Sequence, residues 1–190
     1  MRISKVWIIT GSTEGLGPAV VRYLLTRNQR VIALVPDNFS INLFSGYESE
    51  KLHRLNINLD DKCTCKQAMK MIVKDWGAAD MLINNCGYGL IDTLKSGSNI
   101  LEIENEKEQY LDCTLQTIRL VLPFMKAGPK GHIISLPPKP CLDKLENNIL
   151  YTVLAETLES FSNSLNQRLR VMDKKLTIIE PGVRFKSEFL

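Results

Sequence analysis

The segment Lys5-Val-Trp-Ile-Ile-Thr-Gly-Ser-Thr-Glu-Gly-Leu-Gly17 decides the fold of this chain. Its apolar run, residues 6–9, is short and rich in β-branched residues, which is typical of a buried strand. Three glycines follow, spaced G-x-x-x-G-x-G, and then apolar residues at helical spacing. A strand, a glycine turn and a helix N-terminus together form an anion site, because unpaired N–H groups and the helix dipole point above the turn. The segment therefore predicts a nucleotide site, with an ordinary glycine turn as the alternative.

The bulk composition is that of a soluble globular domain. The chain has 190 residues, of which 44% are hydrophobic and 24% charged, and this length predicts one domain over residues 1–190. A net charge of +3, from scattered basic residues, gives no reason to expect nucleic acid or an anionic membrane as a partner. The sequence contains no secretory pattern and no apolar window of about 20 residues, so we expect a cytoplasmic protein.

The cysteines are expected to be reduced thiols, since their odd number, five, shows no pairing rhythm. Cys63 and Cys65 stand two residues apart, which raises the alternative of a metal or redox pair. No second pair and no nearby histidine completes such a site. We therefore expect two ordinary thiols at a helix start and no metal.

Six strands alternate with helices along the chain. Strands are predicted at residues 6–9, 30–35, 52–59, 80–83, 131–136 and 176–179, and helices from residue 18 and over 64–76, 106–126 and 148–171, with a loop over 89–105. This alternation predicts an α/β fold, in which a doubly wound parallel sheet of six strands carries helices on both faces. The ligand crevice of such a sheet lies at the carboxyl ends of its strands, where the glycine turn and the segments 84–87, 137–140 and 180–182 also fall.

At this point the residues resemble the short-chain dehydrogenase/reductase family, over nearly the whole chain. Thr10-Gly-Ser-Thr-Glu-Gly-Leu-Gly17 is similar to the family's phosphate loop, and Asn84-Asn-Cys-Gly87 to its Asn-Asn-Ala-Gly motif. Gly131-His-Ile-Ile resembles the strand that leads to the catalytic serine. Tyr151 begins a segment similar to the one that carries the catalytic tyrosine, and Glu180-Pro-Gly182 matches the turn after the sixth strand.

The resemblance implies a nicotinamide dinucleotide and hydride transfer to or from a carbonyl or alcohol carbon. A tyrosine passes the proton, a lysine four residues later lowers the tyrosine pKa, a serine polarises the substrate oxygen, and an asparagine supports a water relay. Carried over, the resemblance implies a catalytic role for Tyr151. It implies dinucleotide contacts for Gly11, Ser12, Thr13, Gly15, Leu16, Gly17, Asn58, Asn84, Gly87, Pro181 and Gly182.

Most of the catalytic set is replaced. The lysine position is Ala155, and the serine position falls on Pro138, which offers neither a hydroxyl nor an N–H. The asparagine position falls on Tyr110 without gaps, or near Cys113 with a short deletion. Positioned acid–base catalysis is worth about a hundred- to ten-thousandfold. These replacements therefore predict impaired or absent dehydrogenase activity.

NAD is favoured over NADP if either binds. The end of the second strand, where the adenosine ribose is read, carries Val35 and Pro36, which recognise neither a 2′-hydroxyl nor a 2′-phosphate. Asp37 lies one or two residues further on and is able to reach the ribose. Glu14 in the phosphate loop would repel a 2′-phosphate. These carboxylates favour the dinucleotide with the free 2′-hydroxyl.

The chain ends at Leu190, soon after the sixth strand, whereas the family continues with a substrate-covering segment and a seventh strand. We therefore expect a domain without this lid and an exposed edge at the sixth strand. Three functions stay open: a dinucleotide-binding protein with little or no dehydrogenase activity, an active oxidoreductase that uses Tyr151 with other helpers such as Ser135 or Lys139, and an interaction domain without nucleotide. A homo-oligomer would form through the two long helices, although their apolar residues Leu115, Ile118, Leu122, Leu154, Leu158 and Phe161 favour a role in the core.

Overall fold

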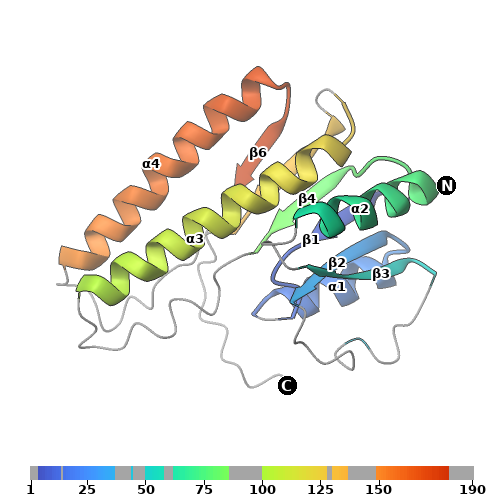
Figure 1. The fold of residues 1–190 in the computed structure, drawn as a ribbon, viewed down its shortest axis with the longest axis horizontal. Helices are drawn as coiled ribbons and strands as arrows, with labels where there is room; N and C mark the ends of the chain where they lie inside the picture. The colour runs from blue at the N-terminus through green and yellow to red at the C-terminus, as the bar shows by residue number, and fades with distance from the viewer. Residues whose placement is uncertain are drawn as a thin grey trace.

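The computed structural model describes residues 4–13, 15–36, 44, 50–57, 62–85, 100–127, 130–136 and 149–179. Its strands form one sheet in which every neighbouring pair is parallel (Figure 1). They are β1 (Val6–Ile9), β2 (Arg30–Pro36), β3 (Leu52–Ile57), β4 (Met81–Asn84), β5 (His132–Ser135) and β6 (Lys175–Ile178), in the order β3-β2-β1-β4-β5-β6. The doubly wound parallel sheet expected from the sequence is confirmed.

The described residues form four α-helices, which are α1 (Gly17–Thr26), α2 (Lys62–Trp76), α3 (Ile100–Val121) and α4 (Ile149–Val171). In Figure 1, α1 lies on one side of the sheet, while α2, α3 and α4 lie on the other. The long helices α3 and α4 run side by side over the half of the sheet that contains β4, β5 and β6. Within the described ranges, no helix is both long and apolar enough to cross a membrane.

The bounds of α3 differ from the prediction at both ends. The helix begins at Ile100, so residues 100–105 are helical rather than part of the predicted loop. Ile, Leu and Glu tolerate a helix well. The stretch Ser96-Gly-Ser-Asn99 misled the prediction, because residue types that favour turns come just before the helix. The α-helix ends at Val121 instead of Lys126 and continues as a 3₁₀ turn, η2 (Leu122–Phe124). Pro123 explains this end, because proline has no N–H to donate to the preceding turn.

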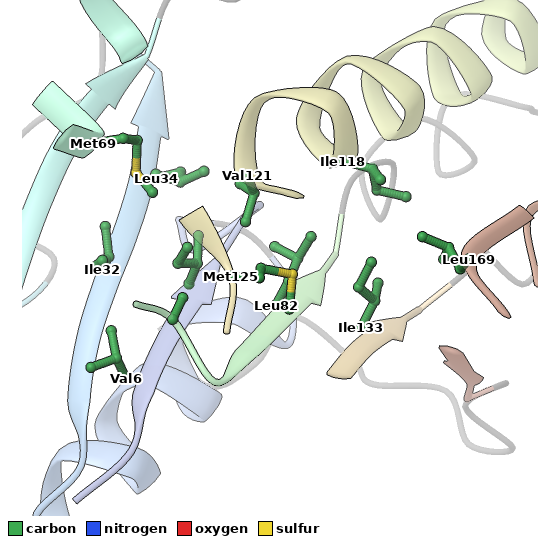
Figure 2. Close-up of a cluster of buried hydrophobic side chains, with 12 residues drawn as sticks. Val6, Ile32, Leu34, Met69, Leu82, Ile118, Val121, Met125, Ile133 and Leu169 are labelled. Atoms are coloured by element: carbon green, nitrogen blue, oxygen red, sulfur yellow. The ribbon is translucent and has the colours of Figure 1, made fainter. Parts of the chain in front are cut away.

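The core lies in two layers because the central strands are buried on both faces. Ile8 and Ile9 follow each other in β1 and point to opposite faces, yet both are fully buried. Figure 2 shows the larger layer, in which side chains of α3 and α4 lie over the middle strands. Its labelled residues are Val6, Ile32, Leu34, Met69, Leu82, Ile118, Val121, Met125, Ile133 and Leu169. Ile118 is a core residue and Leu122 packs against this layer, as the apolar pattern of α3 predicts.

The amino-terminal edge of the sheet is tied together by Asp80. Its carboxylate accepts a hydrogen bond from the Val6 N–H at 2.9 Å and forms an ion pair with Lys126 at 2.5 Å. Its backbone N–H donates to the Val6 carbonyl, and its carbonyl accepts from the His132 N–H. Asp80 is only 8% exposed. One residue therefore fixes the relative positions of β1, β4 and β5 at the edge opposite the glycine turn.

Replacing Asp80 with Ala is expected to lower the free energy of unfolding by about 1–3 kcal/mol, because the buried Val6 N–H loses its acceptor. Urea denaturation measures this loss. Asp75→Ala removes an exposed carboxylate of α2 and should stay within about 0.5 kcal/mol of the wild type. Equal stability of the two variants would contradict a structural role for Asp80.

His132 provides a pH-dependent contribution to stability at the same edge. Burial, and then the positive charges of Lys175 and Lys5, lower the pKa of His132 from its usual 6.5. Its Nε2 lies 2.7 Å from the Thr177 hydroxyl on the neighbouring strand. A histidine whose pKa is lower in the folded than in the unfolded protein favours folding while it is neutral. Its contribution is therefore fully present above about pH 6.5 and decreases as the pH falls through the lowered pKa.

We predict that the wild type loses more stability than His132→Gln between about pH 7.5 and pH 5.5, because only the wild type protonates this partly buried ring, whose pKa is lowered in the folded protein. Urea midpoints at the two pH values provide the measurement. Parallel pH profiles for the wild type and His132→Gln would rule out the assigned contribution.

Candidate functional site

The glycine turn between β1 and α1 is built by two close backbone approaches. A Cβ placed on Gly17 would lie 1.9 Å from the Gly11 carbonyl oxygen. A Cβ on Gly11 would lie 2.2 Å from the Asn85 carbonyl oxygen, and Gly11 also has a positive φ of 54°. No side chain fits at these distances. The turn is therefore pressed between the start of α1 and the end of β4, and only glycine is compatible with both contacts.

The start of α1 has the features of an anion site. Leu16 occupies the N-cap, and no side chain of the described residues caps the helix there. The first turn contains no acidic residue, and Pro18 removes one N–H at the start. The remaining N–H groups and the positive end of the helix dipole suit an anion such as a phosphate. The absence of a Cβ at Gly17 leaves the turn compact enough for a diphosphate to approach the backbone.

The side chains of the turn hold it to the sheet. The Ser12 hydroxyl donates to the Leu34 carbonyl of β2 at 2.8 Å and is fully buried, and Thr13 is also buried. Thr10, at the end of β1, accepts the Asn85 N–H at 2.9 Å. Gly15, with a φ of 53°, is exposed at the outer side of the turn. Ser12 and Thr13 therefore offer their backbone to a ligand more readily than their hydroxyl groups.

Asn84 and Asn85 join the turn to β4. Asn84 is fully buried, and its side chain accepts from the Thr10 hydroxyl and donates to the Thr114 hydroxyl of α3, both at 3.2 Å. The Asn85 amide donates to the Gly11 carbonyl at 3.0 Å. The expected gathering of the glycine turn and the Asn84 segment at the carboxyl edge is therefore observed. Thr114 is a contact that sequence reasoning missed, since it pointed only to Tyr110 or to the neighbourhood of Cys113.

The other predicted site residues lie in α4, in β5 or outside the described residues. Tyr151 and the lysine-position residue Ala155 are four positions apart in the first turns of α4. Ser135 is the last residue of β5, is buried, and pairs in register with Asn84, so it lies inside the strand as expected. Four predicted contact residues lie outside the described residues, as do the two loop residues Pro138 and Lys139. These four are Asn58, Gly87, Pro181 and Gly182.

The two neighbouring cysteines of α2 do not converge on one ligand. Cys63 is exposed, whereas Cys65 is buried in the protein. Successive positions i and i+2 point to different sides of a helix, which explains the difference. Over the described ranges, no group of three or more His, Cys, Asp or Glu side chains is placed to hold a metal ion.

Comparison with known families identifies the fold. A family model described as short chain dehydrogenase matches residues 5–186. The chain belongs to the short-chain dehydrogenase family. The match runs from the residue before β1 to beyond β6, so it includes the glycine turn, the Asn84 segment and α4.

The related proteins are longer than this chain. Oxidoreductase BOA17 of Botryotinia fuckeliana is 26% identical over 182 residues, which cover 95% of this chain and 66% of the relative. An uncharacterized oxidoreductase of Schizosaccharomyces pombe, C162.03, is 29% identical, covering 92% of this chain and 59% of the relative. The chain thus spans about two thirds or less of the length of these two relatives.

Solved structures share the fold at lower identity. L-sorbose reductase of Gluconobacter frateurii, solved with NADPH and L-sorbose, is 18% identical with a TM-score of 0.70, covering 97% of this chain and 72% of that protein. A metagenomic short-chain oxidoreductase, solved with NADP, is 22% identical with a TM-score of 0.68, covering 97% of this chain and 85% of that protein.

Replacing Gly17 with Ala is expected to disrupt the turn, because the new methyl group meets the Gly11 carbonyl rather than a flexible side chain. The free energy of unfolding should fall by about 1–3 kcal/mol. Ala19→Gly, on the exposed side of the same helix, should cost about 0.5–1 kcal/mol through helix propensity alone. Urea denaturation and titration with NAD(H) and NADP(H) compare the two. Only Gly17→Ala should weaken dinucleotide binding, and equal weakening in both variants would contradict the role of the turn.

Proposed function

We propose that this short-chain dehydrogenase binds a nicotinamide dinucleotide and has impaired or no dehydrogenase activity. The observation that carries the proposal is the cradle at the start of α1, where Gly17 meets the Gly11 carbonyl and no side chain caps the described helix end. Such a turn accepts a diphosphate through backbone N–H groups. The proposed contacts are Gly11, Ser12, Thr13, Gly15, Leu16, Gly17, Asn58, Asn84, Gly87, Pro181 and Gly182.

The proposed loss of activity rests on the residues around Tyr151. A nicotinamide dinucleotide supplies hydride transfer when it is bound. The residues of the chain must then move a proton at the tyrosine hydroxyl and polarise the substrate oxygen. An ordinary phenol has a pKa of about 10, so it is protonated near neutral pH. The chain has Ala155 where a lysine would stabilise the phenolate and Pro138 where a serine would donate a hydrogen bond.

The replaced positions should slow both directions of any residual activity. Carbonyl reduction and alcohol oxidation pass through the same transition state, so the loss of the lysine and the serine lowers kcat/KM by the same factor in each direction. The substrate class we propose is a small carbonyl compound or alcohol.

We propose NAD rather than NADP as the preferred dinucleotide, because Glu14 adds a negative charge to the phosphate loop and β2 ends at Pro36 without an arginine. Two solved relatives in fold were crystallised with NADPH or NADP, so affinities for both must be compared. A cytoplasmic location and a homo-oligomer formed through α3 and α4 are further parts of the proposal.

The test combines calorimetric titration with NAD(H) and NADP(H) and turnover on a panel of carbonyls and alcohols. We expect binding with a preference for NAD(H), and turnover that is absent or slow. Restoring the family residues in Pro138→Ser/Ala155→Lys should raise turnover by about a hundredfold or more, since positioned acid–base groups contribute on this scale. Failure to bind any dinucleotide would overturn the proposal.

The alternative is an active oxidoreductase that uses Tyr151 with other helpers, and the intact tyrosine and turn favour it. It predicts substantial turnover in the wild type, lost in Tyr151→Phe. Tyr23→Phe is the matched control, since Tyr23 is exposed on α1. Rapid turnover that disappears only in Tyr151→Phe would replace the first proposal with this one.

A further inference from the structure

Four consecutive hydrogen bonds, three of them buried and the last partly buried, connect α3 to the glycine turn. The series begins at the Thr114 hydroxyl, which accepts from the Asn84 Nδ2 at 3.2 Å, and continues from the Asn84 Oδ1 to the Thr10 hydroxyl at 3.2 Å. The Thr10 hydroxyl oxygen accepts the backbone N–H of Asn85 at 2.9 Å, and the side-chain amide of Asn85 donates to the Gly11 carbonyl at 3.0 Å. Residues from α3, β1 and β4 therefore support the turn through one connected set of contacts.

The donors and acceptors in this series of hydrogen bonds determine which way the Asn84 side-chain amide must face. Thr10 has one hydroxyl proton, and it is given to Asn84 while the oxygen accepts from Asn85. Asn84 must then present its carbonyl oxygen to Thr10 and its NH₂ group to α3. Thr114 supplies the acceptor for that NH₂ group. Because Thr114 and Asn84 are both fully buried, water does not replace this contact.

Asn84 also belongs to the sheet. Its backbone carbonyl accepts the Leu136 N–H at 2.9 Å, and Asn84 pairs in register with Ser135 of β5. The backbone of Asn84 is thus fixed by the sheet. If the hydrogen bonds of its side chain change, the side-chain amide rotates while the backbone stays in place. A rotated amide would present NH₂ to the Thr10 hydroxyl and disturb the contact between Thr10 and Asn85.

We propose that Thr114 is a positioning residue of the dinucleotide site. Its hydroxyl sets the orientation of the Asn84 side-chain amide. Through the contacts of Asn84 with Thr10, and of Asn85 with Thr10 and Gly11, it thereby sets the position of the Gly11 carbonyl next to the start of α1. The inference rests on the proposed dinucleotide binding for its functional consequence. Thr114 itself lies on α3, is fully buried, and among the described contacts reaches the turn through Asn84.

α3 provides a matched control for this role. Thr117 is a second buried threonine one turn further along the same helix, at 1% exposure. Thr114→Val and Thr117→Val each replace a buried hydroxyl with a methyl group of similar shape. Only the first change removes the hydroxyl group that accepts the hydrogen bond from the Asn84 Nδ2. A general effect of burying a methyl group in α3 would appear in both variants, whereas a positioning effect would appear in one.

Two measurements test the proposal on the full chain. The first is the affinity for NAD(H) or NADP(H), whichever the wild type binds more tightly, under conditions where all variants are folded. Thr114→Val should weaken binding roughly tenfold, the scale of one hydrogen bond, while Thr117→Val should bind like the wild type. Thr114→Ser retains the hydroxyl and should restore the affinity.

The second measurement is hydrogen exchange of the Asn85 backbone amide without any dinucleotide. Thr114→Val should speed this exchange about tenfold or more, because the Asn85 N–H is bonded to Thr10. The Lys126 amide, bonded to Ala79 at the far edge, should exchange at an unchanged rate. Thr114→Ala removes the same hydroxyl and serves as the test variant if the valine variant does not fold.

The outcomes separate the two proposals. A wild type that binds no dinucleotide overturns the proposed function, while the exchange data still decide whether Thr114 positions the turn. Wild-type exchange at Asn85 in Thr114→Val, or the same acceleration in Thr117→Val, overturns the positioning role. Fast exchange of the Asn85 backbone amide in Thr114→Val together with wild-type affinity for the dinucleotide would also overturn the positioning role, because the turn would then move without an effect on binding.

Discussion

The close approach of Gly17 to the Gly11 carbonyl is the constraint on which the arrangement of the site depends. It sets α1 directly against the turn, and the contact of Gly11 with Asn85 sets the turn against β4. Because β4 lies between β1 and β5, this small backbone junction fixes the centre of the sheet and the first helix together. The same geometry places the start of α1 beside the glycine turn at the carboxyl edge of the sheet. Packing and the proposed anion binding therefore depend on one close contact.

This double role limits what the motif says about chemistry. Thr10, Asn84 and Asn85 hold β1, β4 and α3 together, and the fold would need them even if no hydride were transferred. Their presence supports a dinucleotide site but does not require an active enzyme. The chemistry proposed for Tyr151, by contrast, depends on partners, and the positions that the family resemblance gives to those partners carry Ala155 and Pro138. The contacts that support the fold and the residues proposed to transfer a proton therefore meet different physical demands.

The opposite edge of the sheet is organised by a different interaction. Asp80 joins the starts of β1, β4 and β5 through its carboxylate and its backbone, and Lys126 neutralises its charge. The ligand edge relies on backbone contacts and neutral side chains instead. Among these described contacts, the charged groups lie at the Asp80 edge and the contacts of the glycine turn are neutral.

The sequence by itself determined the order of strands and helices, the parallel sheet and the position of the glycine turn, because apolar periodicity and glycine spacing are local properties. It placed the core residue Ile118 correctly, but it extended α3 through Pro123 and started the helix too late, since helix ends depend on the balance of neighbouring residues. Only the tertiary structure decided that Thr114 supports Asn84 and that Asp80 joins three strands. These contacts join residues 30 and 74 positions apart, so no local pattern reports them. They arise because the sheet brings distant strand ends to the same edge, where each buried polar group must find a partner.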